Sequence, residues 1–329
     1  NGKNHGVQNY RCYDCKHQFL GGNRINNQVL WQEYTEGKQT YVQLSERYDV
    51  SVRTIQRRLD KVDVKQTFHK PKESIIMMDT TYFGRDFGVM VFKNTKGQHL
   101  YWKFVKYETI KDYVAGIHYL KSQGINIKGI VCDGRKGLFN ALQDYPVQMC
   151  QFHQVAIVTR YITRKPKVQA SIELKEIMHL LPQTDKESFF GALDEWYTKW
   201  EGYVNERAIN PETGKSRYVH KRLRSAYRSL ERNKAYLFTW YDQIKLGLPN
   251  TNNQLEGTFT DLKNKLRNHN GLSRKRKEKF INGFLQASAL KVSKQKKADI
   301  SQPSDTSIDQ DIPDRLLPSR ACFRLPDVQ

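Results

Sequence analysis

The sequence predicts an α/β protein built on a mixed sheet flanked by helices, with mainly helical segments on both sides of it. Short apolar, β-branched and aromatic runs at 75–80, 87–93 and 100–105 predict buried strands. Strand-like and helical runs then alternate, which predicts βαβ crossovers. Residues 24–62 and 156–250 instead carry helical periodicity, so we expect a helical domain before the sheet and an all-helical insertion within the core.

Each core element follows from its local sequence. Residues 94–97 form a hairpin-type loop between the second and third strands. Val114, Ile117 and Leu120 predict a helix over 111–122. The other elements are expected as a strand at 129–133, a short helix at 137–144, a strand at 147–152 and a long helix after Asn250. Hairpin-linked strands followed by βαβ units give a mixed sheet with helices on its faces.

Composition limits the class of protein. The chain has 329 residues, long enough for two or three domains, and 38% of them are hydrophobic, which excludes a disordered chain. No apolar run approaches a membrane span, and no apolar N-terminal stretch indicates a signal peptide. Five scattered cysteines favour a reduced, intracellular protein. A formal net charge of +21 indicates a polyanionic partner, most simply nucleic acid.

Residues 1–20 contain a partial zinc-ribbon motif. Cys12 and Cys15 are spaced as one knuckle of a ribbon. A structural zinc site needs four ligands, and the nearby His5 and His17 do not form a second knuckle. Either Zn²⁺ binds only where the ribbon is completed upstream of Asn1, or the two thiols are free in a partial ribbon.

Residues 24–62 have a helix-turn-helix pattern. Thr40 with Gln43 forms a capping-box signature, and Ser51 is a good N-cap for the next helix after a tight turn. The second helix has an apolar face and a polar face, and the polar residues expected to reach DNA are Arg53, Gln56 and Arg57. The alternative is an ordinary helical hairpin with a solvated charged face.

Three carboxylates are candidate catalytic residues. Asp79 and Asp133 each follow a strand-like run, at the sheet edge where ligands bind in α/β proteins. Glu256 lies beside an apolar stripe of the helix after Asn250, and Lys263 and Arg267 follow on the same ridge. Clustered carboxylates suit Mg²⁺ or Mn²⁺, and two such ions can bracket a phosphodiester. The alternatives are ordinary turn residues and a solvated helix face.

A basic run at 264–280 follows this helix, and we expect it to bind the phosphate backbone through Arg274, Lys275 and Arg276. The alternative is a solubilising surface. Residues 296–329 lack periodicity and predict a mostly disordered tail.

Taken together, the two aspartates, the helical insertion, the glutamate helix and the CQFH segment that holds Cys150 and His153 resemble the DDE transposases of bacterial insertion sequences. The likeness is closest to their Mutator-like branch, which has an RNase H-like core and a CxxH signature, and it covers roughly residues 5–290. It implies Asp79, Asp133 and Glu256 as the metal-binding triad, with Lys263 near the cleaved DNA. Cys150 and His153 are expected beside the active site in a structural role, because two ligands do not close a metal site.

The resemblance implies a transposase that binds terminal inverted repeats and catalyses hydrolysis and strand transfer with two Mg²⁺ or Mn²⁺ ions. Its partners would be the repeat ends and target DNA, as a homodimer or larger assembly in the bacterial cytoplasm, with no membrane. The alternatives are a non-catalytic DNA-binding protein from a domesticated or decayed transposase, and a nuclease with the same core. The expected domains are a partial ribbon (1–20), a helix-turn-helix (24–62), a catalytic core (72–155 and 251–295), a helical insertion (156–250) and a tail (296–329).

Overall fold

The computed structural model describes residues 2–5, 7–21 and 25–300. The chain divides into two units, Asn1–Phe68 with Gly257–Lys291, and His69–Glu256 with Val292–Gln329. Helix α11 (Asn253–Arg267) begins in the second unit and continues into the first. Helix α12 (Arg274–Ile300) includes the first residues of the predicted tail, and the remainder of that tail lies outside the described residues.

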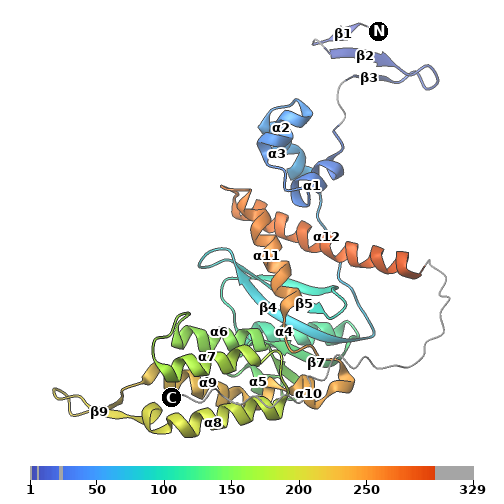
Figure 1. Ribbon diagram of the computed structural model, residues 1–329. Coiled ribbons are helices and arrows are strands. Elements are labelled where there is room, and N and C mark those ends of the chain that lie inside the picture. The colour runs from blue at the N-terminus through green and yellow to red at the C-terminus, as the bar shows by residue number, and fades with distance from the viewer. Residues whose placement is uncertain (1, 6, 22–24, 301–329) are drawn as a thin grey trace. The chain divides into compact units, whose positions relative to one another are not determined.

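A five-stranded sheet is the centre of the second unit (Figure 1). Its strands are β4 (Glu73–Tyr82), β5 (Gly88–Asn94), β6 (His99–Val105), β7 (Asn126–Cys132) and β8 (Val147–Met149). They lie in the order β6-β5-β4-β7-β8; the β4–β5 and β5–β6 pairs are antiparallel, and the β4–β7 and β7–β8 pairs are parallel. This arrangement is RNase H-like, and it confirms the predicted α/β class with a mixed sheet.

Three boundaries differ from the predictions. Asp79 lies within β4 and not at its end, because β4 stays paired with β5 as far as Tyr82, after its pairing with β7 has ended. The strand predicted at 147–152 stops at Met149, and helix α6 (Gln151–Ile162) begins directly after Cys150. The helix predicted at 137–144 is the single turn α5 (Leu138–Ala141). Apolar runs this short do not distinguish a strand from the first turn of a buried helix.

The two faces of the sheet are covered differently. Helix α4 (Ile110–Ser122), whose N-cap is Thr109, packs on the face that carries Phe92, and a side chain at Gly116 would collide with the Phe92 ring. The opposite face carries Met77 and Val131, which pack with Leu248. Because side chains alternate along a strand, Asp79 projects from the same face as Met77.

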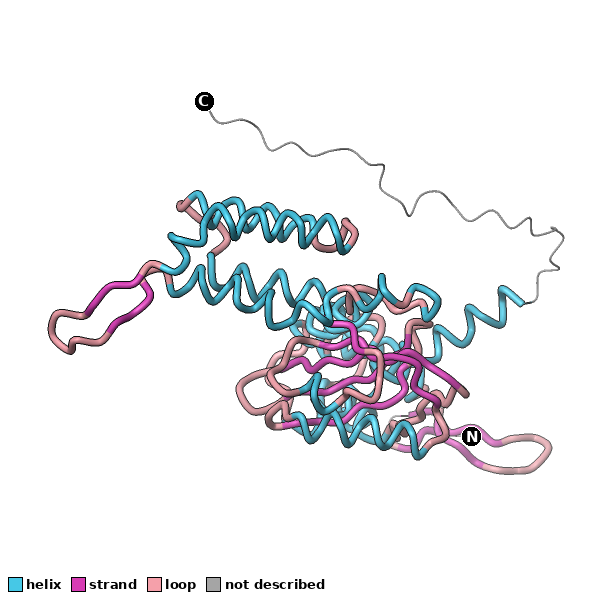
Figure 2. Tube along the Cα trace, turned by 90° about the horizontal axis from the view of Figure 1, so that it is seen from below, coloured by secondary structure: helices cyan, strands magenta, loops and turns pink. Residues whose placement is uncertain are grey.

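A mainly helical insertion separates β8 from α11. Its elements are α6, α7 (Gln169–Leu180), α8 (Lys186–Asn205), α9 (Lys221–Leu237), α10 (Thr239–Asp242) and the 3₁₀ turn η1 (Ile244–Leu246). The prediction that it is all helical is wrong. A hairpin of β9 (Arg207–Ile209) and β10 (Ser216–Tyr218) projects from it, as Figures 1 and 2 show. These strands are too short to produce an alternating pattern in the sequence.

The first unit contains a small antiparallel sheet and a helical cluster. The sheet is β1 (Lys3–Asn4), β2 (Val7–Arg11) and β3 (Gln18–Leu20), and the helices are α1 (Asn27–Thr35), α2 (Tyr41–Tyr48) and α3 (Val52–Lys61) with the first part of α12. Thr40 and Gln43 form the expected capping box, and Ser51 caps α3. Asp49, with φ of 49°, makes the tight turn between α2 and α3. Phe280 of α12 packs against Tyr34 of α1.

Candidate active site

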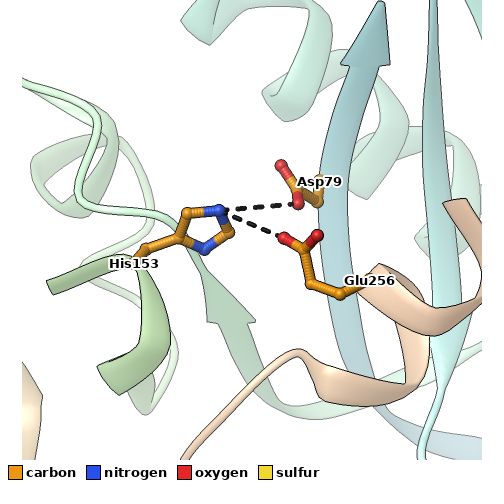
Figure 3. A group of neighbouring side chains, drawn as sticks. All are labelled: Asp79, His153 and Glu256. Carbon is orange, nitrogen blue, oxygen red and sulfur yellow. Dashed lines mark ion pairs between the residues drawn. The ribbon is translucent and has the colours of Figure 1, made fainter. Parts of the chain in front are cut away.

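Asp79, His153 and Glu256 converge from three separate elements of the second unit (Figure 3). His153 Nε2 lies 3.2 Å from Glu256 Oε1 and 3.9 Å from Asp79 Oδ2. Each residue offers one potential ligand atom, and the three atoms lie within 4.8 Å of one another. Among the residues that the structure describes, these are the three His, Cys, Asp or Glu side chains that form a potential metal-binding group.

Asp79 is fixed by the sheet. It projects from the central strand β4, its residue is 7% exposed, and the Thr80 N–H donates to its Oδ1 at 2.7 Å. At this position β4 is paired with β5, where Val91 is the register partner of Asp79, so the strand holds the backbone and the carboxylate has little freedom to move away from the site.

Hydrogen bonds tie the start of α11 to the start of α6 and to β4. The Asn252 backbone N–H donates to Cys150 Sγ at 3.2 Å, and the Asn252 side-chain amide donates to the Met78 carbonyl at 3.3 Å. The Gln151 N–H donates to the Asn250 carbonyl at 3.0 Å. His153 and Glu256 lie in the first turns of these two helices, so these bonds set the position of one side chain against the other.

Asp133 lies next to this group without joining it. Met77 of β4 is the register partner of Val131 of β7, and Asp79 and Asp133 each follow two residues later. Asp133 Oδ1 is buried and has no hydrogen-bond partner among the described residues. Burial raises the pKa of Asp133, and its charge in turn helps to raise the pKa of Asp79. The three predicted acids therefore interact, although Asp133 does not reach the His153 contact.

The buried charges of the site depend on one another. Burial raises the pKa of Asp79 to about 8; the charge of His153 opposes this shift and that of Glu256 adds to it. Burial alone would lower the pKa of His153, but its hydrogen bonds to Cys150 and Glu256 and the charge of Asp79 raise it to about 11. Both shifts favour the protonated forms of His153 and Asp79 at neutral pH, so the positive charge of His153 faces mainly the carboxylate of Glu256.

A neighbouring network around Glu108 was not among the predictions from sequence. Arg135 Nη1 lies 2.9 Å from Glu108 Oε2, and a second guanidinium nitrogen donates to the Glu108 carbonyl. The Tyr113 hydroxyl donates to Glu108 Oε1 at 2.5 Å. The Arg135 backbone N–H donates a hydrogen bond to the Asp133 carboxylate. The network therefore holds the loop on which Asp133 lies. Its one sequence signal is that Arg135 follows Asp133 by two positions.

The predicted DNA-binding residues lie in the first unit. Arg53 and Arg57 are exposed on α3, and Gln56 is half-buried there. Arg276 is held by Asp60 through bonds of 3.1 and 2.7 Å, and Arg274 pairs with Glu278. The remaining positions are Lys263, half-buried on α11, Arg267, exposed on α11, and Lys275, exposed on α12.

The two cysteines of the predicted ribbon lie in the β2–β3 hairpin. The Cys12 N–H donates to the His17 carbonyl at 2.9 Å. Cys15 is exposed in the turn, and Cys12 is partly exposed. Within the described ranges, neither cysteine belongs to a group of three or more potential metal ligands.

Comparisons with known proteins give loose structural likenesses. No family model matches the chain, and no curated protein matches it. A Drosophila P element transposase strand transfer complex overlays with a TM-score of 0.31 and 13% identity, covering 86% of this chain and 83% of that one. The simian T-cell lymphotropic virus intasome in complex with PP2A regulatory subunit B56 gamma gives a TM-score of 0.21 and 11% identity, over 58% of this chain and 69% of that one. Overlays this loose establish no function for the chain.

Among the helices that the structure describes, none combines the length and the apolar character needed to cross a bilayer.

Proposed function

We propose that the chain is a DDE-type DNA transposase whose acids Asp79, Asp133 and Glu256 act together on a phosphodiester of DNA. The observation that carries the proposal is the convergence of Asp79 and Glu256, far apart in the chain, with Asp133 directly after the adjoining strand β7. A structural role alone would not call for three acids at one edge of the sheet, because burying them together is costly. The net charge of +21 suits a DNA partner.

The residues present fit divalent metal ions. Oxygen donors from several carboxylates are the ligands that Mg²⁺ and Mn²⁺ prefer, and Asp133 Oδ1 is a buried acceptor with no protein partner among the described residues. Asp79, Asp133 and Glu256 would hold the ions. When bound, such ions activate the attacking water or hydroxyl and stabilise the leaving oxygen.

The remaining residues of the site position these acids. His153 keeps the carboxylates of Asp79 and Glu256 together by lying between them, and the Thr80 N–H orients the Asp79 carboxylate. Cys150 holds the first turn of the helix that carries Glu256, through the Asn252 N–H. These groups support a preorganised site, in which the acids keep their places before DNA binds.

Binding of the element's terminal repeats is assigned to α2 and α3. Their capped helices and tight turn are compatible with a helix-turn-helix, and Arg53 and Arg57 are exposed on the face that would enter a DNA groove. As in the prediction from sequence, the assembly on DNA would be a dimer or larger, since two ends must be held.

Nicking of supercoiled plasmid DNA tests the proposal. The parent chain should nick the plasmid with MgCl₂ or MnCl₂ and not with EDTA. Asp79→Asn, Asp133→Asn and Glu256→Gln should each reduce nicking to the level without protein. Asp86→Asn, an exposed acid in the turn after β4, is the matched control and should keep the parent rate. Nicking by any of the three site variants at the parent rate would refute the triad, and nicking without strand joining would identify a nuclease.

A further inference from the structure

Two acid-free segments supply a group of cations in the helical insertion. Residues 145–172 and 213–230 contain no Asp or Glu. Six exposed residues from these segments form what we call the α6–α9 basic cluster: Arg160, Arg164, Lys165, Lys167, Lys221 and Arg222. A mixed surface chosen only for solubility would intersperse both signs of charge.

The packing of α9 on α6 brings the two segments together. Arg222, in the first turn of α9, donates from Nε to the Tyr161 carbonyl and from Nη2 to the Arg160 carbonyl, each at 2.9 Å. Lys175 Nζ donates to the Arg164 carbonyl at 2.7 Å and secures the loop between α6 and α7. The cluster is therefore a defined surface at the C-terminal end of α6, where the helix dipole also favours cations.

The charge of the cluster is not neutralised within the protein. In the part of the chain that the structure describes, none of its six members takes part in a salt bridge. Glu173, the first acid after residues 145–172, pairs with Lys199 at 2.9 Å and not with a member of the cluster. The cations are thus available to an external polyanion.

The cluster and the candidate active site share one helix. His153 lies in the first turn of α6, and the helix ends at Ile162. At 1.5 Å per residue the separation along the axis is about 14 Å, which is about four nucleotides of one strand at 3.4 Å each. A strand that holds a phosphate at Asp79 and Glu256 and runs along α6 would therefore meet the cluster a few nucleotides away.

We propose that the α6–α9 basic cluster binds the phosphate backbone of duplex DNA a few nucleotides from the phosphate held at the acids. This inference rests on the proposed function, because it assigns to the same DNA a second contact in the insertion. The cluster would hold the DNA without selecting its sequence, since phosphate contacts carry no sequence information.

The test measures the salt dependence of DNA binding. The full chain is titrated onto a fluorescent duplex of random sequence over a series of KCl concentrations. The variant Arg164→Gln/Lys165→Gln/Lys167→Gln removes three charges from the cluster. The control Lys111→Gln/Lys121→Gln/Lys245→Gln removes three exposed charges elsewhere in the same unit. Each lost phosphate contact lowers the slope of log K against log[KCl] by about 0.9.

The cluster variant should lower the slope by about 2 to 3, and the control by less than half as much. Equal slopes for the two variants would overturn the inference. The cluster would then be assigned to an acidic protein surface and not to DNA. A parent chain that binds no DNA would refute both proposals. A parent that binds through the cluster but never nicks DNA would refute the proposed function and support this inference.

Discussion

His153 Nε2 of α6 lies 3.2 Å from Glu256 Oε1 of α11, and the same nitrogen lies 3.9 Å from Asp79 Oδ2 of β4. One imidazolium thus bridges two acids that come from different elements. Its pKa of about 11 follows from the hydrogen bonds to Cys150 and Glu256 and from the charge of Asp79, which together outweigh the opposing effect of burial. The histidine of the CQFH segment therefore supplies positive charge between the carboxylates, and the cysteine of that segment fixes a backbone amide.

Replacing His153 should destabilise the metal-free protein. In His153→Gln, Asp79 and Glu256 lose the charge between them, and we expect the free energy of unfolding in urea with EDTA to fall by about 1–3 kcal/mol. The control is His118→Gln, an exposed histidine on α4. A loss of unfolding free energy no larger than that of the control would show that the His153 bridge does not stabilise the metal-free protein.

Cys150 should be replaceable by serine but not by alanine. The Cys150 side chain is fully buried and accepts the Asn252 N–H. Cys150→Ala leaves that N–H without a partner, which costs about 1–3 kcal/mol of unfolding free energy. Cys150→Ser keeps an acceptor and should recover part of the loss, measured by urea denaturation. Equal losses in both variants would mean that the sulfur contributes only by filling space.

Arg135 should affect catalysis by positioning Asp133. Arg135→Gln removes the ion pair to Glu108, and we expect metal-dependent nicking to slow by about 10- to 100-fold, as for other residues that orient metal-binding groups. The neighbouring exposed Lys136→Gln is the control. The circular dichroism spectrum should be unchanged in both. If Arg135→Gln nicks DNA at the parent rate, the Glu108 network does not position Asp133.

Protonation of the buried His269 should make the protein less stable at mildly acidic pH. Its ring lies 4.3 Å from that of Tyr34 and 5.0 Å from that of Phe280, and burial lowers its pKa, with a backbone hydrogen bond to Tyr34 acting against this shift. A histidine whose pKa is lowered in the folded protein contributes its full share of stability at pH values above its pKa in the unfolded chain, about 6.5. That stability is lost as the pH falls toward the folded-state pKa.

Unfolding in urea at pH 7.5 and pH 5.0 measures this loss. His269→Phe, which keeps an aromatic ring, should lose less stability between the two pH values than the parent chain does. The difference between parent and variant isolates His269 from the other titrating groups. An identical pH dependence in both would show that His269 ionises as freely in the folded protein as in the unfolded chain.

The sheet was predictable because its runs carry strong local signals. The run IIMM before Asp79 and the run GIVC before Asp133 are apolar and lead directly into an acid, so the pairing of adjacent strands was enough to bring both acids near each other, although Asp79 lies within β4 and not at its end. The helix starts at Thr40 and Ser51 were predictable for the same reason. In each, the side-chain oxygen accepts a hydrogen bond from the backbone N–H three residues later, so the signal is local.

The contacts of the site were not predictable in the same way. The bridge from His153 to Glu256 depends on how α6 packs beside α11, and no spacing in the sequence encodes that packing. The same is true of Arg135 and Glu108, whose pairing joins two loops. The basic residue Arg276 was expected to face DNA, but the sequence did not show that Asp60 would hold it.

A strand-joining assay with Glu256→Gln tests whether the three acids form one catalytic site. A labelled duplex from the DNA that flanks the coding sequence is incubated with plasmid and MgCl₂. We expect joining by the parent chain and by Asp261→Asn, a change on the same helix, and none by Glu256→Gln. Joining by Glu256→Gln at the parent rate would contradict this expectation.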